Sequence, residues 1–238
     1  MGAPVPTVRL PTYVSRMPLR LPLFPLGVVL FPGVLLPLHI FEPRYRRLLE
    51  DIAEGERQFG LLLPGIGREA PPAGAVGTIA ELRATQPLPE GRSNIVVQGG
   101  QRFMVSRYVD DEAPYLVAMV EPFEDRDDAP VSASALAELT TQFQRYDTAR
   151  RALHDVEPDD EPLPTEAGPL SFRVAGGMEL DLVEQHRLLE LRSTRARVER
   201  LLELLPPRVR EVEAGAAVHR RARHNGKGHM HPGLTGEA

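Results

Sequence analysis

The sequence predicts an α+β protein, in which a small, mostly antiparallel β-barrel with one inserted helix precedes a bundle of α-helices. Two observations lead to this prediction. Between residues 58 and 121, short apolar segments with the period of β-strands alternate with turn residues. From about residue 130 onward, apolar residues recur at spacings of three and four, which is typical of α-helices. A doubly wound nucleotide-binding fold is disfavoured, because its strands would alternate with helices.

The residues from Leu21 to Phe41 include no charged side chain, and such a run could be taken for a membrane-spanning helix. The prolines at positions 22, 25, 32 and 37 argue against that interpretation, because each removes a backbone donor and clashes with the preceding helical turn. The same prolines suit edge strands and turns, and Pro32-Gly33 is the strongest turn signal. We therefore expect a strand, a turn and a second strand.

The first of these strands begins at Leu19, where apolar and other residues alternate. In the second strand both faces are largely apolar. One face consists of Val34, Leu36, Leu38 and Ile40, and the other of Leu35, Pro37, His39 and Phe41. Such a strand is either covered on both faces, for example by the helical bundle, or presents an exposed apolar surface.

A helix follows directly after this strand. Pro43 suits the first helical position, and Gly55 suits the end of the helix. Between them the apolar residues fall at the spacing i, i+3, i+4, i+7, at Tyr45, Leu48, Leu49 and Ile52. The charged residues of the opposite face are typical of an ordinary solvated surface.

Five further strands are expected in the barrel, separated by turns that include Pro64-Gly65 and Gly99-Gly100. Their predicted ranges are Gln58–Leu63, Val76–Ala84, Ser93–Gln98, Arg102–Val109 and Tyr115–Glu121. Short strands at such intervals are typical of a closed or nearly closed barrel.

The composition changes near Glu121, where an acidic stretch begins. The spacing predicts a long helix from about Pro130 to His154, and shorter helices over 170–175 and 181–191. A last helix after Ser193 should be interrupted or ended by Pro206-Pro207. The expected organisation is a flexible leader (1–17), the barrel (18–124), the helical bundle (125–206) and a basic, disordered tail (207–238).

Composition also narrows the class of protein. The chain has no cysteine, which excludes disulfides, thiolate metal sites and a cysteine nucleophile, and which fits the cytoplasm. The net charge of −5 disfavours non-specific binding to nucleic acid. The interrupted apolar run argues against export and against a membrane partner. We expect no cofactor.

The stretch LPLFPLGVVLFPGVLLPLHIFEPRYRRLLED resembles the N-terminal substrate-binding domain of the ATP-dependent protease Lon, in the form found in stand-alone bacterial proteins. The resemblance continues through VGTIAELRA, IVVQGGQRFMV and PYLVAMVEPFED, and into LSFRVAGGMELDLVEQHRLLE and RVERLLELL. It covers roughly residues 18–205. The resemblance implies a PUA-like pseudo-barrel followed by a helical bundle, and a role in recognising polypeptides within protein quality control.

The chemistry of full-length Lon proteases is not expected here. A Walker A loop needs a lysine followed by Ser or Thr, and a serine-lysine dyad needs a lysine packed beside the serine. The sole lysine, Lys227, is followed by Gly228 in a Gly-rich stretch. The G-x-S-x-G and H-E-x-x-H motifs are also absent. We therefore expect no enzymatic activity.

The candidate site is a surface that binds extended polypeptide through Leu35, His39, Phe41 and Phe31. Its expected partners are unfolded or partly exposed polypeptides, with a protease or a chaperone as a further partner. Two purely structural interpretations compete with this binding site. His39 suits a histidine that is simply packed and hydrogen-bonded at the end of a strand, and the whole face suits packing against the helices.

Other possible sites are weaker. The acidic pairs Asp127-Asp128 and Asp159-Asp160 suit solvated loops better than catalysis or metal binding. The tail histidines, His224, His229 and His231, would bind a metal only adventitiously. Two alternative functions stay open: RNA binding, since PUA-like barrels occur in RNA-binding proteins and the tail is basic, and a cryptic hydrolase.

Overall fold

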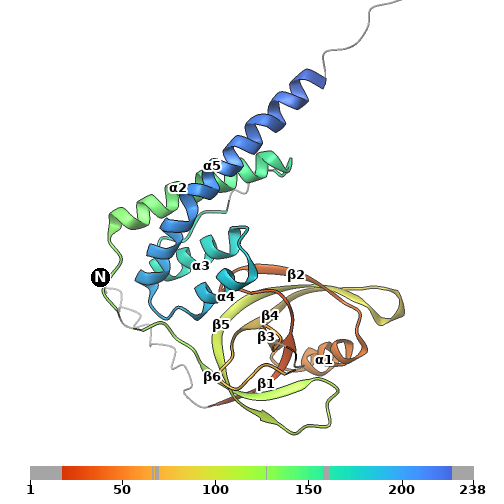
Figure 1. Cartoon of the computed structure of the whole chain (residues 1–238). Coiled ribbons are helices and arrows are strands. Elements are labelled where there is room, and N and C mark those ends of the chain that lie inside the picture. The colour runs from red at the N-terminus through yellow and green to blue at the C-terminus, as the bar shows by residue number, and fades with distance from the viewer. Residues whose placement is uncertain (1–17, 66, 68–69, 127, 158–160, 227–238) are drawn as a thin grey trace, which may run out of the picture.

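The fold is that of a computed structural model, which describes residues 18–65, 67, 70–126, 128–157 and 161–226. Six strands come first, with α1 (Pro43–Ala53) inserted between the second and the third and a 3₁₀ turn (Pro89–Gly91) between the fourth and the fifth (Figure 1). The strands are β1 (Leu19–Pro25), β2 (Leu35–Ile40), β3 (Gln58–Leu62), β4 (Val76–Pro87), β5 (Ser93–Val109) and β6 (Leu116–Pro122). Four helices follow: α2 (Ala133–Leu153), α3 (Ala167–Gly177), α4 (Leu182–Glu190) and α5 (Thr194–Gly226). The predicted α+β class is confirmed.

The strands form one sheet in the order β2-β5-β4-β3-β1-β6, and an additional pairing of β5 with β6 closes it into a barrel. All pairs are antiparallel except β1 with β3. Inside the barrel, β1, β5 and β6 contribute a buried cluster that includes Leu23, Phe103 and Val120. The first half of β5 also pairs with β2, so that one long strand belongs to both the barrel and its extension.

The prediction of two strands separated by a turn at Gly99-Gly100 is wrong, because β5 runs without interruption through both glycines. Gly99 allows two backbones to approach closely, because a Cβ atom on it would lie 2.1 Å from the carbonyl oxygen of Phe31. A Cβ atom on Gly100 would meet mainly the flexible carboxylate of Glu81, at 2.8 Å. Gly99 also donates to the carbonyl of Val34 at 2.9 Å, and its own carbonyl accepts from Gly33. The strand therefore needs glycine here in order to pass beneath the turn that leads into β2.

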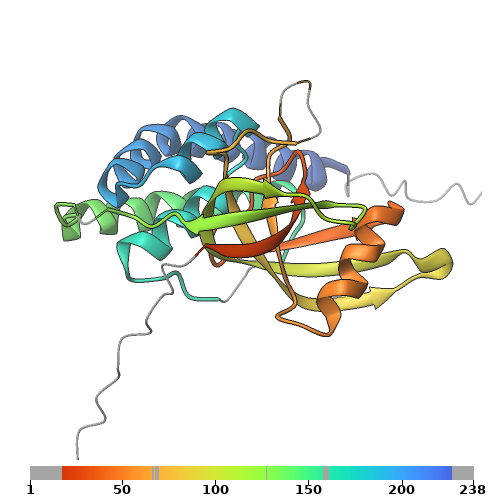
Figure 2. The ribbon, with the colours of Figure 1, turned by 90° about the horizontal axis from the view of Figure 1, so that it is seen from below.

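The helices form a second layer against one side of the barrel (Figures 1 and 2). Their core is continuous with the barrel through Phe31 and Val76, which lie in the same buried cluster as Phe143, Leu170 and Leu201. Helices α2 and α5 run side by side in the same direction. Arg145 of α2 pairs with Glu213 of α5 at 2.9 Å, and Asp155, just after α2, pairs with Arg223 further along α5. None of the helices in the described ranges is long and apolar enough to cross a membrane.

The expectation that Pro206-Pro207 interrupts or ends the last helix is wrong, since α5 continues through both prolines to Gly226. The structure of residues 207–226 likewise corrects the predicted disordered tail, whereas residues 227–238 lie outside the described ranges, as do residues 1–17. The prolines remove two helical donors, but the residues beyond them are held by packing. Val209 is 1% exposed and belongs to the helical core, and Ala216 is 1% exposed. Burial therefore outweighs the local cost of the prolines.

Candidate functional site

Three strands extend beyond the barrel as a wing, which consists of β2, residues 82–87 of β4 and residues 93–98 of β5 (Figure 1). One face of the wing packs on α1. There Ile40, Ile95 and Val97 are buried in a cluster with the apolar residues of α1, Tyr45, Leu48 and Ile52. This packing uses the helix face that the sequence spacing predicts. It also fixes the register of β2, because a slip by one residue would exchange the two faces of the strand.

The opposite face of β2, continued by Phe41 directly after the strand, is open. Leu35 is 58% exposed and Phe41 is 60% exposed, while Pro37 and His39 between them are also exposed. We call these four residues the β2 face. The competing interpretation, in which this face packs against the helical bundle, is wrong for its two large apolar side chains. Fully burying each of them would contribute roughly 1.5–3 kcal/mol, so the β2 face holds unused apolar surface.

Polar side chains from β4 and β5 border the β2 face. The Nδ1–H of His39 donates to Oδ1 of Asn94 at 2.8 Å, and the His39 ring stacks on Phe41 with centroids 5.9 Å apart. Together these strands enclose a shallow hollow of about 530 Å³, lined by Pro37, His39, Ala84, Gln86, Asn94 and Val96. Such a surface offers apolar contact together with side-chain amides that can bond to a peptide backbone.

Phe31 does not belong to this surface, although we predicted it there. It is 1% exposed and packs into the helical core, with its ring centroid 6.3 Å from that of Phe172 in α3. The turn before β2 carries it inward: the carbonyl of Leu30 accepts from the hydroxyl of Thr78 at 2.6 Å. Phe31 therefore anchors the start of β2 between the barrel and the helices. The structure brings together Leu35, His39 and Phe41 only.

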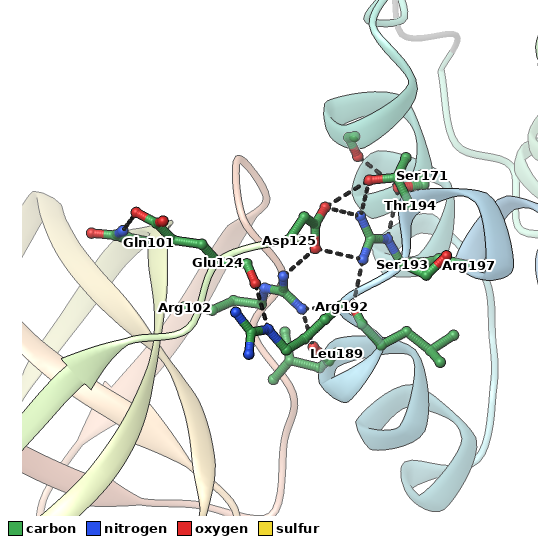
Figure 3. A network of polar contacts seen from close by, with 12 residues as sticks. Gln101, Arg102, Glu124, Asp125, Ser171, Leu189, Arg192, Ser193, Thr194 and Arg197 are labelled. Carbon is green, nitrogen blue, oxygen red and sulfur yellow. Dashed lines mark hydrogen bonds and ion pairs between the residues drawn. The ribbon is translucent and has the colours of Figure 1, made fainter. Parts of the chain in front are cut away.

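A second polar cluster joins the barrel to the helices, and we call it the junction. It consists of Arg102 from β5, Asp125 from the connection to α2, and Arg197 from α5 (Figure 3). Arg102 pairs with Asp125 and also donates to the carbonyls of Leu189 and Leu191 at the end of α4. Arg102 is 4% exposed and Arg197 is 0% exposed. One carboxylate thus holds two buried guanidinium groups that come from different parts of the fold.

The partners of Arg197 complete the junction. Arg197 donates to Asp125 at 2.7 Å, to the hydroxyl of Ser171 in α3 at 2.8 Å and to the carbonyl of Leu191 at 2.7 Å. The hydroxyl of Thr194 donates to Asp125 at 2.7 Å. Burial alone would raise the pKa of Asp125, but the hydrogen bonds and charge of Arg197, with the hydroxyl of Thr194, outweigh it and lower the pKa below its ordinary value. Asp125 is therefore a carboxylate in the folded protein, and the junction is structural.

Sequence reasoning missed the junction. In the sequence, Asp125 belongs to the acidic stretch that begins near Glu121 and has no feature that separates it from its acidic neighbours. The partners lie 23 and 72 residues away from Asp125 in the chain. No local pattern reports a contact of that range.

The described residues contain no group of three or more side chains that could hold a metal ion. Asp128 accepts a hydrogen bond from Ser193, and its neighbour Asp127 lies outside the described residues, as do Asp159 and Asp160. The same is true of His229 and His231, while the side chain of His224 is not described.

Comparison with known proteins matches residues 20–206 to the family model of the ATP-dependent protease La (LON) substrate-binding domain. The Lon protease of Anaeromyxobacter dehalogenans is 32% identical over 228 residues, which cover 89% of this chain and 26% of the relative. Lon protease 2 of Myxococcus xanthus is 29% identical over 208 residues, which cover 82% of this chain and 24% of the relative. The chain thus spans about a quarter of the length of the curated relatives that it matches.

Solved structures agree. A Lon N-terminal domain protein from Xanthomonas campestris superposes with a TM-score of 0.60 and 26% sequence identity, covering 79% of this chain and 99% of that chain. The N-terminal domain of the Mycobacterium avium complex Lon protease gives a TM-score of 0.56 at 16% identity, covering 77% of this chain and 96% of that chain, and supports the fold alone. The match to the family model, over residues 20–206, includes the barrel, the β2 face and the helices up to Pro206. The chain therefore belongs to the Lon substrate-binding domain family.

Proposed function

We propose that this protein is a non-catalytic module that binds unfolded or partly exposed polypeptide through the β2 face, as an adaptor or regulator of protein quality control in the cytoplasm. The observation that carries the proposal is the exposure of Leu35 and Phe41 on one face of a strand whose other face is fixed on α1. Exposed apolar side chains along one face of a strand, bordered by polar groups, are typical of interaction sites. A protease or chaperone is the expected recipient of the bound polypeptide.

The chemistry of the surface suits an extended, apolar stretch of polypeptide. Apolar side chains on the β2 face can bury those of a client, and the amides of Gln86 and Asn94 can bond to its backbone. A folded client buries its apolar residues and pairs its backbone groups internally, so it offers neither. The surface therefore favours unfolded chains.

Binding of a fluorescent, permanently unfolded model protein, followed by anisotropy, tests the proposal. We expect saturable binding by the purified protein, with neither ATP hydrolysis nor cleavage of the model protein. Leu35→Asp and Phe41→Asp should each weaken binding at least about tenfold, because a charge would have to be desolvated against the client.

Val183→Asp provides the matched control. Val183 lies in α4 and is 61% exposed, close to the value for Phe41. This substitution adds the same charge to an equally exposed apolar position outside the wing. Unaltered binding by the β2-face variants, or an equal loss with Val183→Asp, would contradict the assignment of the site.

A further inference from the structure

The outer edge of β2 carries backbone groups that point away from the sheet. In the described part of the chain β2 pairs with β5 alone and ends the order of strands. Antiparallel partners alternate between residues bonded across the pair and residues whose backbone groups face outward. The carbonyl of Val34 accepts from the N–H of Gly99 at 2.9 Å. By this alternation Leu36, Leu38 and Ile40 bond to β5, and Leu35, Pro37 and His39 face outward.

The absence of a backbone N–H at Pro37 removes no hydrogen bond between β2 and β5. It stands opposite Val96 in the register, and its ring nitrogen faces the outer edge. The edge therefore offers N–H groups at Leu35 and His39 and carbonyls at all three outward residues. The side chains of the same residues form the β2 face, so the bonding edge and the apolar surface belong to one stretch of backbone.

The wing has a second edge, and it is less suitable. Beyond Leu82 the outer side of β4 is also without a partner strand among the described residues. The register of β4 with β5 shifts between Leu82 and Ala84, which makes Arg83 a bulge. Bulges bend a strand and disrupt its edge, and Pro87 removes a further donor. Only the β2 edge is regular over its whole length.

We propose that the client adds to the outer edge of β2 as a strand. This inference rests on the proposed function and specifies its mode of recognition. Main-chain bonds to Leu35, Pro37 and His39 would supply affinity for any extended segment, while the β2 face selects apolar side chains at alternate positions. On the other face, side chains of the added strand would lie beside Leu36 and Leu38, which are half-buried. The favoured client is therefore an uncharged, aliphatic-rich segment, such as a core strand of a protein that has unfolded.

A second copy of this chain is a poorer occupant of the edge. In a two-fold pair centred on Pro37, two prolines would face each other, so that two carbonyls would meet without a donor. A client with an ordinary residue at this position can donate its N–H to the Pro37 carbonyl. Pro37 thus discourages self-pairing of the edge, a known use of proline in edge strands, and leaves it open to a different chain.

Two backbone-methylated versions of one peptide test this mode of binding. The parent is a labelled, extended peptide with leucine and valine at alternate positions and threonine between them. One version carries N-methyl groups on the apolar residues and the other on the threonines, so that each removes donors along one edge only. We expect one version to bind at least about tenfold more weakly than the parent, which corresponds to one or two hydrogen bonds, and the other to bind like the parent.

The outcomes separate this inference from the proposed function. Equal binding of both versions, with Leu35→Asp still abolishing it, would overturn strand addition and leave polypeptide binding intact. Failure of the parent and of the unfolded model protein to bind would overturn both.

Pro37→Ala adds one donor and should raise peptide affinity about fivefold, whereas the control Pro87→Ala on the β4 edge should not. Equal effects of these two substitutions would also count against the β2 edge.

Discussion

The junction and the β2 face differ in how their side chains are satisfied: the junction pairs its polar groups within the protein, whereas the β2 face leaves apolar groups exposed. At the junction, Arg102 and Arg197 are almost wholly buried, and Asp125 with main-chain carbonyls satisfies both guanidinium groups. On the wing, by contrast, Leu35 and Phe41 remain exposed above a strand with an open edge. At the junction, buried ion pairs hold the barrel against the helices. The wing leaves apolar and main-chain groups unused, which is the property expected of a binding surface on a rigid support.

The largest effect is expected from breaking the junction. Asp125→Ala should lower the free energy of unfolding by about 3–5 kcal/mol, because it leaves two buried cations without their counter-charge. Urea unfolding followed by circular dichroism measures the change. Glu203→Ala removes an exposed partner of Arg200 and should cost less than about 1 kcal/mol. Equal losses for the two variants would show that the junction is no more important than a surface pair.

A slightly smaller effect is expected within α5, beyond the prolines. Val209→Asp should destabilise the protein by about 2–4 kcal/mol, because Val209 is 1% exposed in the helical core. The same urea experiment applies. Ala214→Asp, at an exposed position of the same helix, serves as the control and should change stability little. If Val209→Asp left the free energy of unfolding unchanged, this part of α5 would not pack against the helical core.

The pH dependence of stability sharpens the role of Asp125. Its pKa is lower in the folded protein than in the unfolded chain, where it is about 3.9. Its contribution is therefore complete above that unfolded value, and it is lost as the pH falls through the lower, folded-state pKa. Asp125→Asn should be less stable than the wild type at pH 7, and the difference should shrink toward pH 3. Thermal unfolding across this range checks it; a difference independent of pH would contradict the ion pair.

The smallest effect on stability is expected at the β2 face. Leu35→Asp should change the free energy of unfolding by less than about 0.5 kcal/mol, since the side chain is already 58% exposed. The same substitution should nevertheless abolish most of the binding. A parallel loss of stability and binding would instead assign Leu35 to the core.

Sequence could predict those parts of the molecule that depend on local periodicity. The two faces of β2 and the buried stripe of α1 follow from periods of 2 and 3.6, and both are confirmed. Gly99 was misread because glycine gives the same signal in a turn and where two backbones approach closely. Pro206 was misread because tertiary burial of Val209 overrides the local preference. The burial of Phe31 depends on a helix more than 130 residues away, and periodicity carries no information on such contacts.

Amide hydrogen exchange tests the contrast between the two regions most directly. The exchange of residues 34–41 and of residues 186–192 should be measured with and without a saturating unfolded polypeptide. We predict that bound polypeptide slows exchange in the β2 segment, where the amides of Leu35 and His39 face outward, and leaves exchange unchanged in the junction segment at the end of α4. Protection confined to other parts of the chain, or equal protection of both segments, would contradict it.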